Sequence, residues 1–502
     1  MKFNTNKTAS EATVSSYEGG TVYERKLEDE WQNMLFSSVL EDGYYESAAT
    51  QTDRYVDLTR QMADKYGEQF VAKAATFSRN VLGLRSISAL TAALLNSRQF
   101  ENKRGFYASY FHRPDDVAEV FAAVKTLDDK RSHGLIRGAA DYVSRLDDYR
   151  LGKYQMRGKE FNLLDLVNLT HAHSDAIDRL KAGTLRTPDT WEVAISAAEN
   201  EDVRAREWIR LVEEGKLGYL ALIRNLRNIV KAAATLYDVP RPNTWLYDEL
   251  APRICDKTAI ERSLVYPHQI YAAWVALQTA DVACPASVEQ ALENAFIASL
   301  TNMPEFDGTT AIIIDVSGSM TQTFSKFSSL SVLQISAVFA AAFLMLNPKT
   351  QVVKFGSAAK LCDYANLRLS PFRLIEAISD NEGMGYSTNI TAAFDAINVP
   401  ADRILLFSDM QVMDASYDDY YSRYVPDCRS GFDAYRAFKR RCACAPHIYS
   451  FDLGNYHSQL TPPKTGDISY ITTLNDKVFR IAKMQESGKT LVDIIQEWNM
   501  IE

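Results

Sequence analysis

The chain has 502 residues, of which 46% are hydrophobic and 24% are charged, and its formal net charge at neutral pH is −9. This length is too great for one hydrophobic core and predicts two or three domains. The composition excludes an intrinsically disordered chain. The negative charge excludes a protein coated with basic residues, but it leaves room for a local basic groove that binds a nucleic acid.

The first three hundred residues are predicted to be helical from Glu18 to about Ile297, because apolar residues recur there at spacings of three and four. Gly, Pro, Asp and Asn separate the segments. The predicted helices are 31–40, 55–66, 70–80, 87–96, 117–127, 134–149, 161–169, 203–213, 216–237, 260–280 and 288–299. Helices joined by short turns without strands indicate an all-α helical-repeat array of the HEAT-like kind.

The pattern changes at residues 301–310, where Pro304, Asp307 and Gly308 mark a linker. Strands and helices then alternate, which predicts a Rossmann-like α/β domain with a parallel sheet and right-handed crossovers. The predicted elements are 311–316, 330–346, 351–355, 372–378, 390–397, 403–407, 433–443 and 447–453. The apolar run 330–346 is too short to cross a bilayer and contains Gln334, so it is expected to be a buried helix. The tail 476–502 is predicted to be helical and to dock onto a core through Val492, Ile494, Ile495 and Trp498.

Three oxygen-bearing side chains follow the apolar strand in the segment A-I-I-I-D-V-S-G-S-M, namely Asp315, Ser317 and Ser319. Open α/β sheets place their ligand sites at the carboxyl ends of strands. Carboxylate and hydroxyl oxygens suit a hard divalent cation such as Mg²⁺. The alternative is structural: Asp315 caps the next helix and the serines form a turn.

Six cysteines are scattered through the chain, and the first twenty residues lack the apolar core of a secretory signal. We therefore expect a cytoplasmic protein with free thiols. Cys428, Cys442, Cys444 and His447 resemble a zinc set, but the Cys-x-Cys spacing lacks the usual two-residue spacer, and zinc is not expected.

The segment 125–171 is the best candidate for a surface that contacts phosphates. Its basic residues are Lys130, Arg131, His133, Arg137, Arg145, Arg150, Lys153, Arg157 and Lys159, with Tyr142, Tyr149 and Tyr154 between them. Lys and Arg neutralise phosphates, and tyrosine rings stack on unpaired bases. Asp128, Asp129, Asp147 and Asp148 interrupt the run, so the alternative is a set of solvated helix faces with paired charges.

Motifs of common enzymes are missing from the sequence, including a phosphate-binding Gly-Lys-[Ser/Thr] loop, His-Glu-x-x-His and a Gly-x-Ser-x-Gly elbow. Ser317 and Ser319 lie beside an aspartate with no evident histidine base, so they are poor nucleophiles. The sequence therefore predicts a protein that is not an enzyme.

The Asp-x-Ser-x-Ser segment resembles the metal-ion-dependent adhesion site of von Willebrand factor A domains. That family completes its site with a threonine and an aspartate from two further loops. The matching residues are Thr388 in G-M-G-Y-S-T-N and Asp409 after the strand 403–407, with Ser387 as an alternative to Thr388. The resemblance implies a divalent cation, Mg²⁺ by preference, whose open position a carboxylate of a partner protein completes.

The helical part resembles the TROVE module of the Ro autoantigen family of RNA-binding proteins. The segments that carry the likeness are E-G-G-T-V-Y-E at 18–24, F-V-A-K-A-A-T-F-S-R-N-V-L-G-L-R at 70–85, L-G-K-Y-Q-M-R-G-K-E-F-N-L-L-D-L-V-N-L-T-H at 151–171 and K-L-G-Y-L-A-L-I-R-N-L-R at 216–227, with Tyr-Pro-His at 266–268. The resemblance implies a flexible N-terminus (1–17), a ring of helical repeats (18–300) and a von Willebrand factor A-like domain (301–502).

The same resemblance implies a monomeric, non-catalytic protein of RNA quality control. Small structured RNA of the Y type would bind the outer surface, and single-stranded ends of misfolded RNA would enter a central hole. Expected outer contacts are Lys153, Arg157, His171 (or His173) and, in the basic segment, Arg137.

Arg79, Arg85, Arg224 and Arg227 are expected at the hole, the alternative being that Arg85 and Arg224 pair with buried carboxylates. An exoribonuclease or another protein would dock at the metal site. The competing function is a metal-dependent protein-interaction scaffold without RNA cargo.

Overall fold

The computed structural model describes residues 13–15, 21–36, 40, 46–185, 190–237, 244–279, 285–324, 328–347, 349–367, 369–385, 388–410, 431–453, 458–459, 468–471, 478–486 and 488–498. The chain divides into two compact units. A sheet unit comprises Met1–Asn33, Glu41–Ala48 and Glu305–Leu474, and a helical unit comprises Met34–Leu40, Ala49–Pro304 and Asn475–Glu502. Among the described helices, none combines the length and the apolar character that crossing a bilayer requires.

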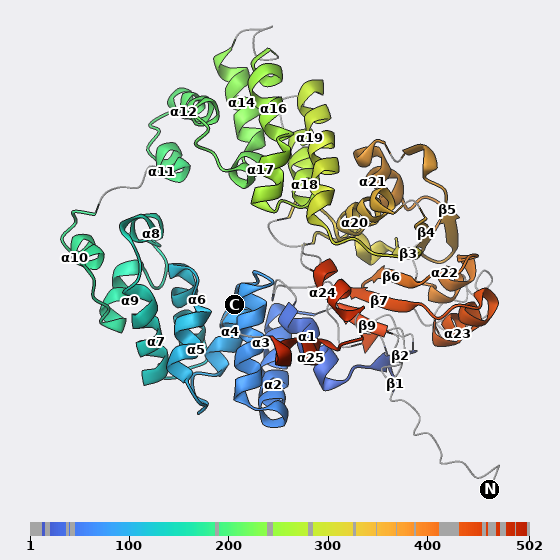
Figure 1. Cartoon of the computed structure of the whole chain (residues 1–502), viewed down its shortest axis with the longest axis horizontal. Helices are drawn as coiled ribbons and strands as arrows, with labels where there is room; N and C mark the ends of the chain where they lie inside the picture. Colours follow the sequence, from blue (N-terminus) through green and yellow to red (C-terminus); the bar gives the residue numbers. More distant parts are fainter. Residues whose placement is uncertain are drawn as a thin grey trace. The chain divides into compact units, whose positions relative to one another are not determined.

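The helical unit is built from short helices whose neighbours in space are close in sequence (Figure 1). Helix α1 (Leu27–Phe36) has residues in both units. The helices that follow are α2 (Ala48–Tyr66), α3 (Glu68–Asn80), α4 (Ser86–Leu94), α5 (Lys103–Tyr110), α6 (Pro114–Thr126), α7 (His133–Val143), α8 (Asp148–Lys153), α9 (Leu163–Thr170), α10 (Asp175–Lys181), α11 (Trp191–Ser196), α12 (Glu201–Glu213), α13 (Tyr219–Arg224), α14 (Leu226–Leu236), the π-helix η1 (Leu246–Leu250), α16 (Ala251–Ile254), α17 (Lys257–Ser263), α18 (Pro267–Gln278), α19 (Ala286–Ser299) and the short 3₁₀-helix η2 (Leu300–Asn302).

Packing in this unit pairs each helix mainly with the next or the next but one. Helix α3 packs on α4 and α5, α4 on α6, α5 on α7, α12 on α14, and α18 on α19. Each of these helices buries an apolar stripe, such as Ile229, Val230 and Ala233 on α14. This nearest-neighbour packing confirms the predicted all-α array for the described residues from α2 to α19.

Three segments that were each predicted to be one long helix form two helices in the structure. The segment 134–149 breaks into α7 and α8 because the side chain of Asp147 accepts a hydrogen bond from the amide of Arg150 (2.8 Å) and caps a new helix. The segment 216–237 breaks at Asn225. The segment 260–280 breaks after Leu264, whose φ is 51°, and Pro267 begins α18 at a position that needs no amide hydrogen. Helices α5, α10 and α11 were not predicted.

The main sheet of the other unit has six strands in the order β5-β4-β3-β6-β7-β9. The strands are β3 (Thr310–Asp315), β4 (Gln351–Phe355), β5 (Ala359–Cys362), β6 (Arg403–Ser408), β7 (His447–Asp452) and β9 (Ile468–Ile471). β4, β3, β6 and β7 are parallel, as predicted, whereas the parallel strand β9 and the antiparallel edge strand β5 were not predicted. The sheet is therefore mixed rather than purely parallel.

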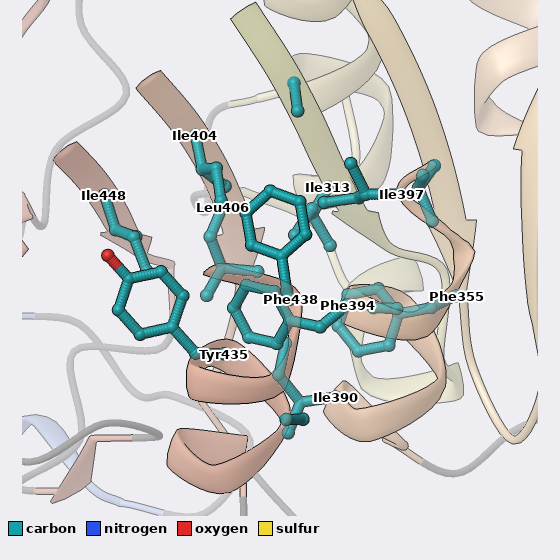
Figure 2. Close-up of a cluster of buried hydrophobic side chains, with 14 of the residues drawn as sticks. Ile313, Phe355, Ile390, Phe394, Ile397, Ile404, Leu406, Tyr435, Phe438 and Ile448 are labelled. Carbon is teal, nitrogen blue, oxygen red and sulfur yellow. The ribbon is translucent and has the colours of Figure 1, made fainter. Parts of the chain in front are cut away.

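Helices cover both faces of this sheet, as alternation of side chains along each strand requires. They are α20 (Val332–Leu346), α21 (Pro371–Ser379), α22 (Ile390–Ala396) and α23 (Gly431–Cys442), with short 3₁₀ turns η3 (Gly318–Thr321) and η4 (Ala365–Leu367) between elements. Figure 2 shows one face, where α22 and α23 place Phe394, Tyr435 and Phe438 against Ile313 of β3 and Leu406 of β6. On the other face α20 contacts β3, so the predicted buried helix is confirmed.

A small second sheet in this unit replaces the helix expected after Glu18. It joins β1 (Thr13–Ser15), β2 (Thr21–Glu24) and β8 (Ser458–Gln459) in antiparallel order, and Val22 packs into the core below the main sheet. Arg25 follows β2 and forms an ion pair with Asp452 at the end of β7, with side chains 1% and 0% exposed. This pair holds the N-terminal strands to the main sheet.

The C-terminal helices α24 (Val478–Gln485) and α25 (Leu491–Glu497) belong to the helical unit. Helix α25 packs on α3, and the ring of Trp498 meets that of Phe77 edge-on with centroids 5.5 Å apart. The Nζ of Lys73 donates to the carbonyl oxygen of Gln496 (2.8 Å). The predicted docking of the tail onto a core is confirmed, and the core is that of the helical array.

Candidate functional site

The carboxyl ends of β3 and β6 are joined by a side-chain hydrogen bond. The hydroxyl of Ser408 donates to Oδ2 of Asp315 (2.7 Å), and the amide of Ser317 donates to Oδ1 (2.9 Å). Asp315 and Ser408 are both fully buried, and so is Asp409, which follows Ser408. Because adjacent strands lie about 5 Å apart, Asp315 and Asp409 belong to one small region at the carboxyl edge of the sheet.

A second loop reaches the same edge beside β4. The amide of Asn389 donates to the carbonyl oxygen of Gly356, which follows β4 (2.9 Å). A Cβ at Gly356 would lie 2.6 Å from the carbonyl oxygen of Gly385, so only glycine permits this close approach. Thr388, in this loop, is buried, with 7% of its surface exposed. Ser387, the alternative ligand, lies outside the described residues.

The serines of the first loop have hydroxyls that approach each other, Ser317 Oγ lying 3.4 Å from Ser319 Oγ. The structural alternative for this loop was that Asp315 caps the next helix. Helix α20 is instead capped by Ser331, whose side chain accepts a hydrogen bond from the amide of Gln334 (3.1 Å). The loop oxygens are therefore not consumed by capping the long helix.

The charge of Asp315 is not balanced by a basic side chain in the part of the chain that the structure describes, whereas Asp452 on β7 is balanced by Arg25. Burial raises the pKa of the Asp315 carboxyl to about 6, although hydrogen bonds from Ser317 and Ser408 favour the ionised form. A buried carboxylate surrounded by neutral oxygens fits a hard divalent cation. This donor set could hold Mg²⁺ through Asp315, Ser317, Ser319, Thr388 and Asp409.

The cysteine set considered for zinc is only partly described. Cys442 and Cys444 are free and partly buried, Cys428 lies outside the described residues, and the Nε2 of His447 is 2.8 Å from the hydroxyl of Ser469. Within the described residues, no group of three or more His, Cys, Asp or Glu side chains is arranged to hold a metal ion.

In the helical unit, the acidic residues that interrupt the basic segment are engaged locally. Asp147 caps α8, Asp148 pairs with Arg179 (2.5 Å), and Asp129 accepts from the side-chain amide of Asn96 (2.8 Å). The basic side chains that remain exposed and form no ion pair within the described residues include Lys130, Arg137, Arg150 and Lys159. These contacts occupy acidic residues of the segment, so the four exposed cations give it positive charge at the surface.

Two tyrosines on and after α8 carry cations on their rings. The guanidinium of Arg113 lies 4.9 Å from the ring centroid of Tyr154, and the Nζ of Lys153 lies 6.0 Å from that of Tyr154 and 5.8 Å from that of Tyr149. We call Arg113, Tyr149, Lys153 and Tyr154 the tyrosine cluster. Tyr149 is 51% exposed, so one ring remains open for stacking.

Lys153 also lies 3.5 Å from the Oε1 of Glu192 on α11. Burial opposes the charge of Lys153, but Glu192 and the two tyrosines outweigh that effect and raise its pKa. Lys153 is thus a cation already held by a carboxylate, which its place in the sequence did not reveal.

The other expected outer contacts are exposed. The Nε of Arg157 donates to the side chain of Gln155 (2.8 Å). His171 ends α9 in a left-handed conformation with φ 53°, and His173 lies two residues beyond, its amide donating to the hydroxyl of Ser144 (3.3 Å). Both histidines are exposed, so the choice between them stays open.

The arginines expected at the hole differ in whether they form ion pairs. Arg85 pairs with Asp115 and lies 3.7 Å from Asp116, and the buried Arg79 forms two hydrogen bonds to Asp116 (2.8 and 3.0 Å). The alternative that Arg85 locks neighbouring helices therefore describes the geometry seen. Contact between Arg85 and RNA stays a prediction.

Arg224 at the end of α13 and Arg227 and Lys231 on α14 are exposed. Arg227 and Lys231 are four residues apart and therefore lie on one face of α14. We call these three residues the α14 stripe. No Asp or Glu occurs between Lys216 and Tyr237, and no member of the stripe forms an ion pair among the described residues. The opposite side of α14 is buried, so the charges point away from the core.

Sequence reasoning missed several residues of these sites. Lys231 was recoverable, since it lies four residues after Arg227 on the same helix face. Ser408 precedes the predicted ligand Asp409, but its bond to Asp315 depends on strand register. Arg113 and Glu192 reach Tyr154 and Lys153 only through tertiary packing.

Parts of the chain are similar in sequence to known proteins. The model of the TROVE domain family matches residues 158–317. Telomerase protein component 1 of Rattus norvegicus is 24% identical over 262 aligned residues, which cover 34% of this chain and 10% of the relative. Telomerase protein component 1 of Mus musculus is 24% identical over 255 residues, which cover 32% of this chain and 10% of the relative. The chain thus spans about one tenth of the length of these relatives.

A likeness in structure extends over most of the chain. The crystal structure of the Deinococcus radiodurans Ro (RSR) protein aligns with a TM-score of 0.61 and 15% sequence identity, covering 90% of this chain and 98% of that chain. At this identity the likeness shows a shared fold.

Proposed function

We propose that this chain, a member of the TROVE-domain family with the fold of a Ro protein, is an RNA-binding protein that acts without catalysis. The observation that carries the proposal is the α14 stripe: three exposed cations, at the end of α13 and along α14, that form no ion pair among the described residues. Solvated helix faces usually mix charges of both signs, whereas a stripe of one sign suits a polyanion.

The finer proposal assigns two kinds of RNA to two surfaces of the helical unit. Structured RNA of the Y type binds the basic segment, where Arg137, Arg157, His171 and the tyrosine cluster are available. Single-stranded ends of misfolded RNA bind at the α14 stripe, inside a ring of helices. These activities together would serve RNA quality control in the cytoplasm, in line with the free thiols of the four described cysteines.

The sheet unit contributes a proposed divalent-cation site at the carboxyl edge of β3, β4 and β6. Its ligands would be Asp315, Ser317, Ser319, Thr388 and Asp409, and the cation Mg²⁺. When bound, the ion supplies a positive charge that neutralises the buried carboxylates and an open position for a partner's carboxylate. The protein's own residues bind and orient the ion, and no residue described at this edge is arranged as a nucleophile with its base. An exoribonuclease or another protein that processes RNA is the proposed partner.

The experiment that tests the proposal measures binding of a single-stranded RNA tail as salt is varied. Affinity should fall linearly with the logarithm of the salt concentration, since bound phosphates release counterions. Lys231→Glu should weaken binding about tenfold or more, whereas Lys257→Glu, a matched exposed lysine on α17, should leave it within about twofold.

The competing proposal is a metal-dependent protein-interaction scaffold without RNA. A dedicated cation site is favoured in either case by the contrast at this edge of the sheet: Arg25 balances the buried Asp452, whereas no basic side chain among the described residues balances Asp315. Absence of RNA binding at low salt, together with cation-dependent binding of an acidic peptide, would establish the scaffold instead.

A further inference from the structure

The ammonium group of Lys153 has two kinds of neighbour. Its ring contacts with Tyr149 and Tyr154 come from α8 and the residue after it, so they fix the Nζ in place. Its charge partner, Glu192, lies on α11, 39 residues farther along the chain, with an Nζ to Oε1 distance of 3.5 Å. The side chains of Lys153 and Glu192 are 28% and 41% exposed, so water and ions reach the pair.

Helix α11 is held weakly. It has six residues, from Trp191 to Ser196, and none of them is buried. Its packing is against α12, where the rings of Trp191 and Trp208 lie with centroids 5.8 Å apart. The ion pair of Glu192 with Lys153 is therefore one direct link between α11 and α8.

The carboxylate of Glu192 is also incompletely satisfied. Its Oε2 is buried from solvent and accepts no hydrogen bond from any described residue. A buried oxygen without a donor makes the bound arrangement of a carboxylate less favourable than full hydration would be. Replacing this carboxylate at Lys153 by another anion therefore costs little free energy.

We propose that Glu192 is an internal competitor of RNA: in the free protein it occupies Lys153, and a phosphate of bound RNA displaces it. The inference rests on the proposed function and specifies how the RNA surface at the tyrosine cluster is regulated. An RNA that places a single phosphate at Lys153 gains little binding free energy, because the phosphate must first replace Glu192. A structured RNA that also contacts Arg137, Arg150 and Arg157 gains enough to displace it, so Glu192 sharpens discrimination between RNAs.

The test is the affinity of a structured RNA hairpin for the full chain and its variants. Glu192→Gln removes the competing charge and keeps the side-chain shape, so binding should tighten about two- to fivefold, the range expected for one exposed ion pair. Glu199→Gln is the matched control: Glu199 is exposed, forms no ion pair among the described residues, and gives the same change in net charge. It should tighten binding by clearly less.

A double variant separates competition from a general charge effect. In a Lys153→Met background, Glu192→Gln should tighten binding no more than Glu199→Gln does, because the cation that it frees is gone. Equal gains from Glu192→Gln and Glu199→Gln in the wild-type background, or the full gain of Glu192→Gln in the Lys153→Met background, would overturn the inference while leaving RNA binding intact. A wild-type chain that binds no RNA at low salt would instead overturn the proposed function and, with it, this inference.

Hydrogen exchange of the wild-type chain supplies a measurement that needs no variant. If RNA displaces Glu192, the amides of α11 should exchange faster in the complex than in the free protein, since α11 loses its tie to α8. Slower exchange of α11 in the complex would contradict displacement.

Discussion

Ser408 and Asp315 connect two strands at the edge of the main sheet, the hydroxyl of Ser408 donating to the Oδ2 of Asp315 at 2.7 Å with both residues fully buried. The hydrogen bond fixes the carboxylate between β3 and β6. It also sets the position of Asp409, which is the next residue after Ser408.

Replacing Ser408 by alanine should therefore destabilise the protein. Asp315 loses a donor in a buried environment, and the free energy of unfolding should fall by about 1–3 kcal/mol. Ser379→Ala, which removes a partly exposed hydroxyl on α21 of the same unit, should change it by less than about 0.5 kcal/mol. Urea denaturation measures both, and equal changes would show that the inter-strand bond contributes nothing specific.

Asp315→Asn should abolish stabilisation by Mg²⁺. If the ion binds the folded wild-type protein only, a concentration of about 100 times its Kd adds about 2.7 kcal/mol, visible as a higher Tm. The substitution keeps the side-chain shape but removes the charge, so the Tm of the variant should no longer respond. Asp402→Asn is the control, because Asp402 caps the opposite end of β6 by accepting from Thr309 and should keep the response. A large loss of RNA affinity in folded Asp315→Asn would contradict the assignment of RNA to the helical unit.

Arg79→Met should be among the most destabilising changes in the helical unit. The Arg79 and Asp116 side chains are 9% and 3% exposed, and removal of the cation leaves a buried carboxylate without its main partner. A loss of about 3–5 kcal/mol is expected. Arg60→Met, at an ion pair that is 58% and 69% exposed, should cost less than about 1 kcal/mol. Calorimetry or urea denaturation checks the difference.

Lys153→Glu combined with Arg157→Glu should weaken structured RNA more than single-stranded RNA. The two changes put like charge next to Glu192 and remove two cations from the basic segment, so at least about a tenfold loss for the hairpin is expected. Lys231→Glu should show the opposite preference. Filter binding with both RNAs measures the four affinities, and equal losses in each variant would mean that the two surfaces are misassigned.

Much of the main sheet could be predicted from the sequence because its signals are local. The isoleucines before Asp315 and the run before Asp409 are continuous apolar strands, and both lie where they were expected. The antiparallel edge β5 was missed because A-K-L-C is only four residues long and has no distinct pattern. Leu264 ended a helix that apolar spacing alone would have continued, since a left-handed residue leaves no signal when it is not glycine.

Only part of the candidate sites could be predicted from the sequence, because some of their contacts depend on tertiary packing. Residue type and position after a strand singled out Asp315, the resemblance to von Willebrand factor A domains added Asp409, and their common edge followed from parallel pairing. The pairing of Lys153 with Glu192, and of Arg85 with Asp115, depends on how separate helices pack, which spacing along the chain does not encode. Charge density alone therefore overestimated how many of these cations are unengaged.

The pairing of β2 with β8 has a consequence for synthesis of the protein. Tyr23 and Glu24 bond with Gln459 and Ser458, and Arg25 pairs with Asp452, 427 residues away. At typical elongation rates of about 5–20 residues per second, the N-terminal strands wait roughly 20 to 90 seconds on the ribosome for these partners. Most helices between them pack on near neighbours, so they can form while the nascent chain is still growing. The small sheet forms only after residues 458–459 have been made, and the packing of α25 on α3 has to wait longer still.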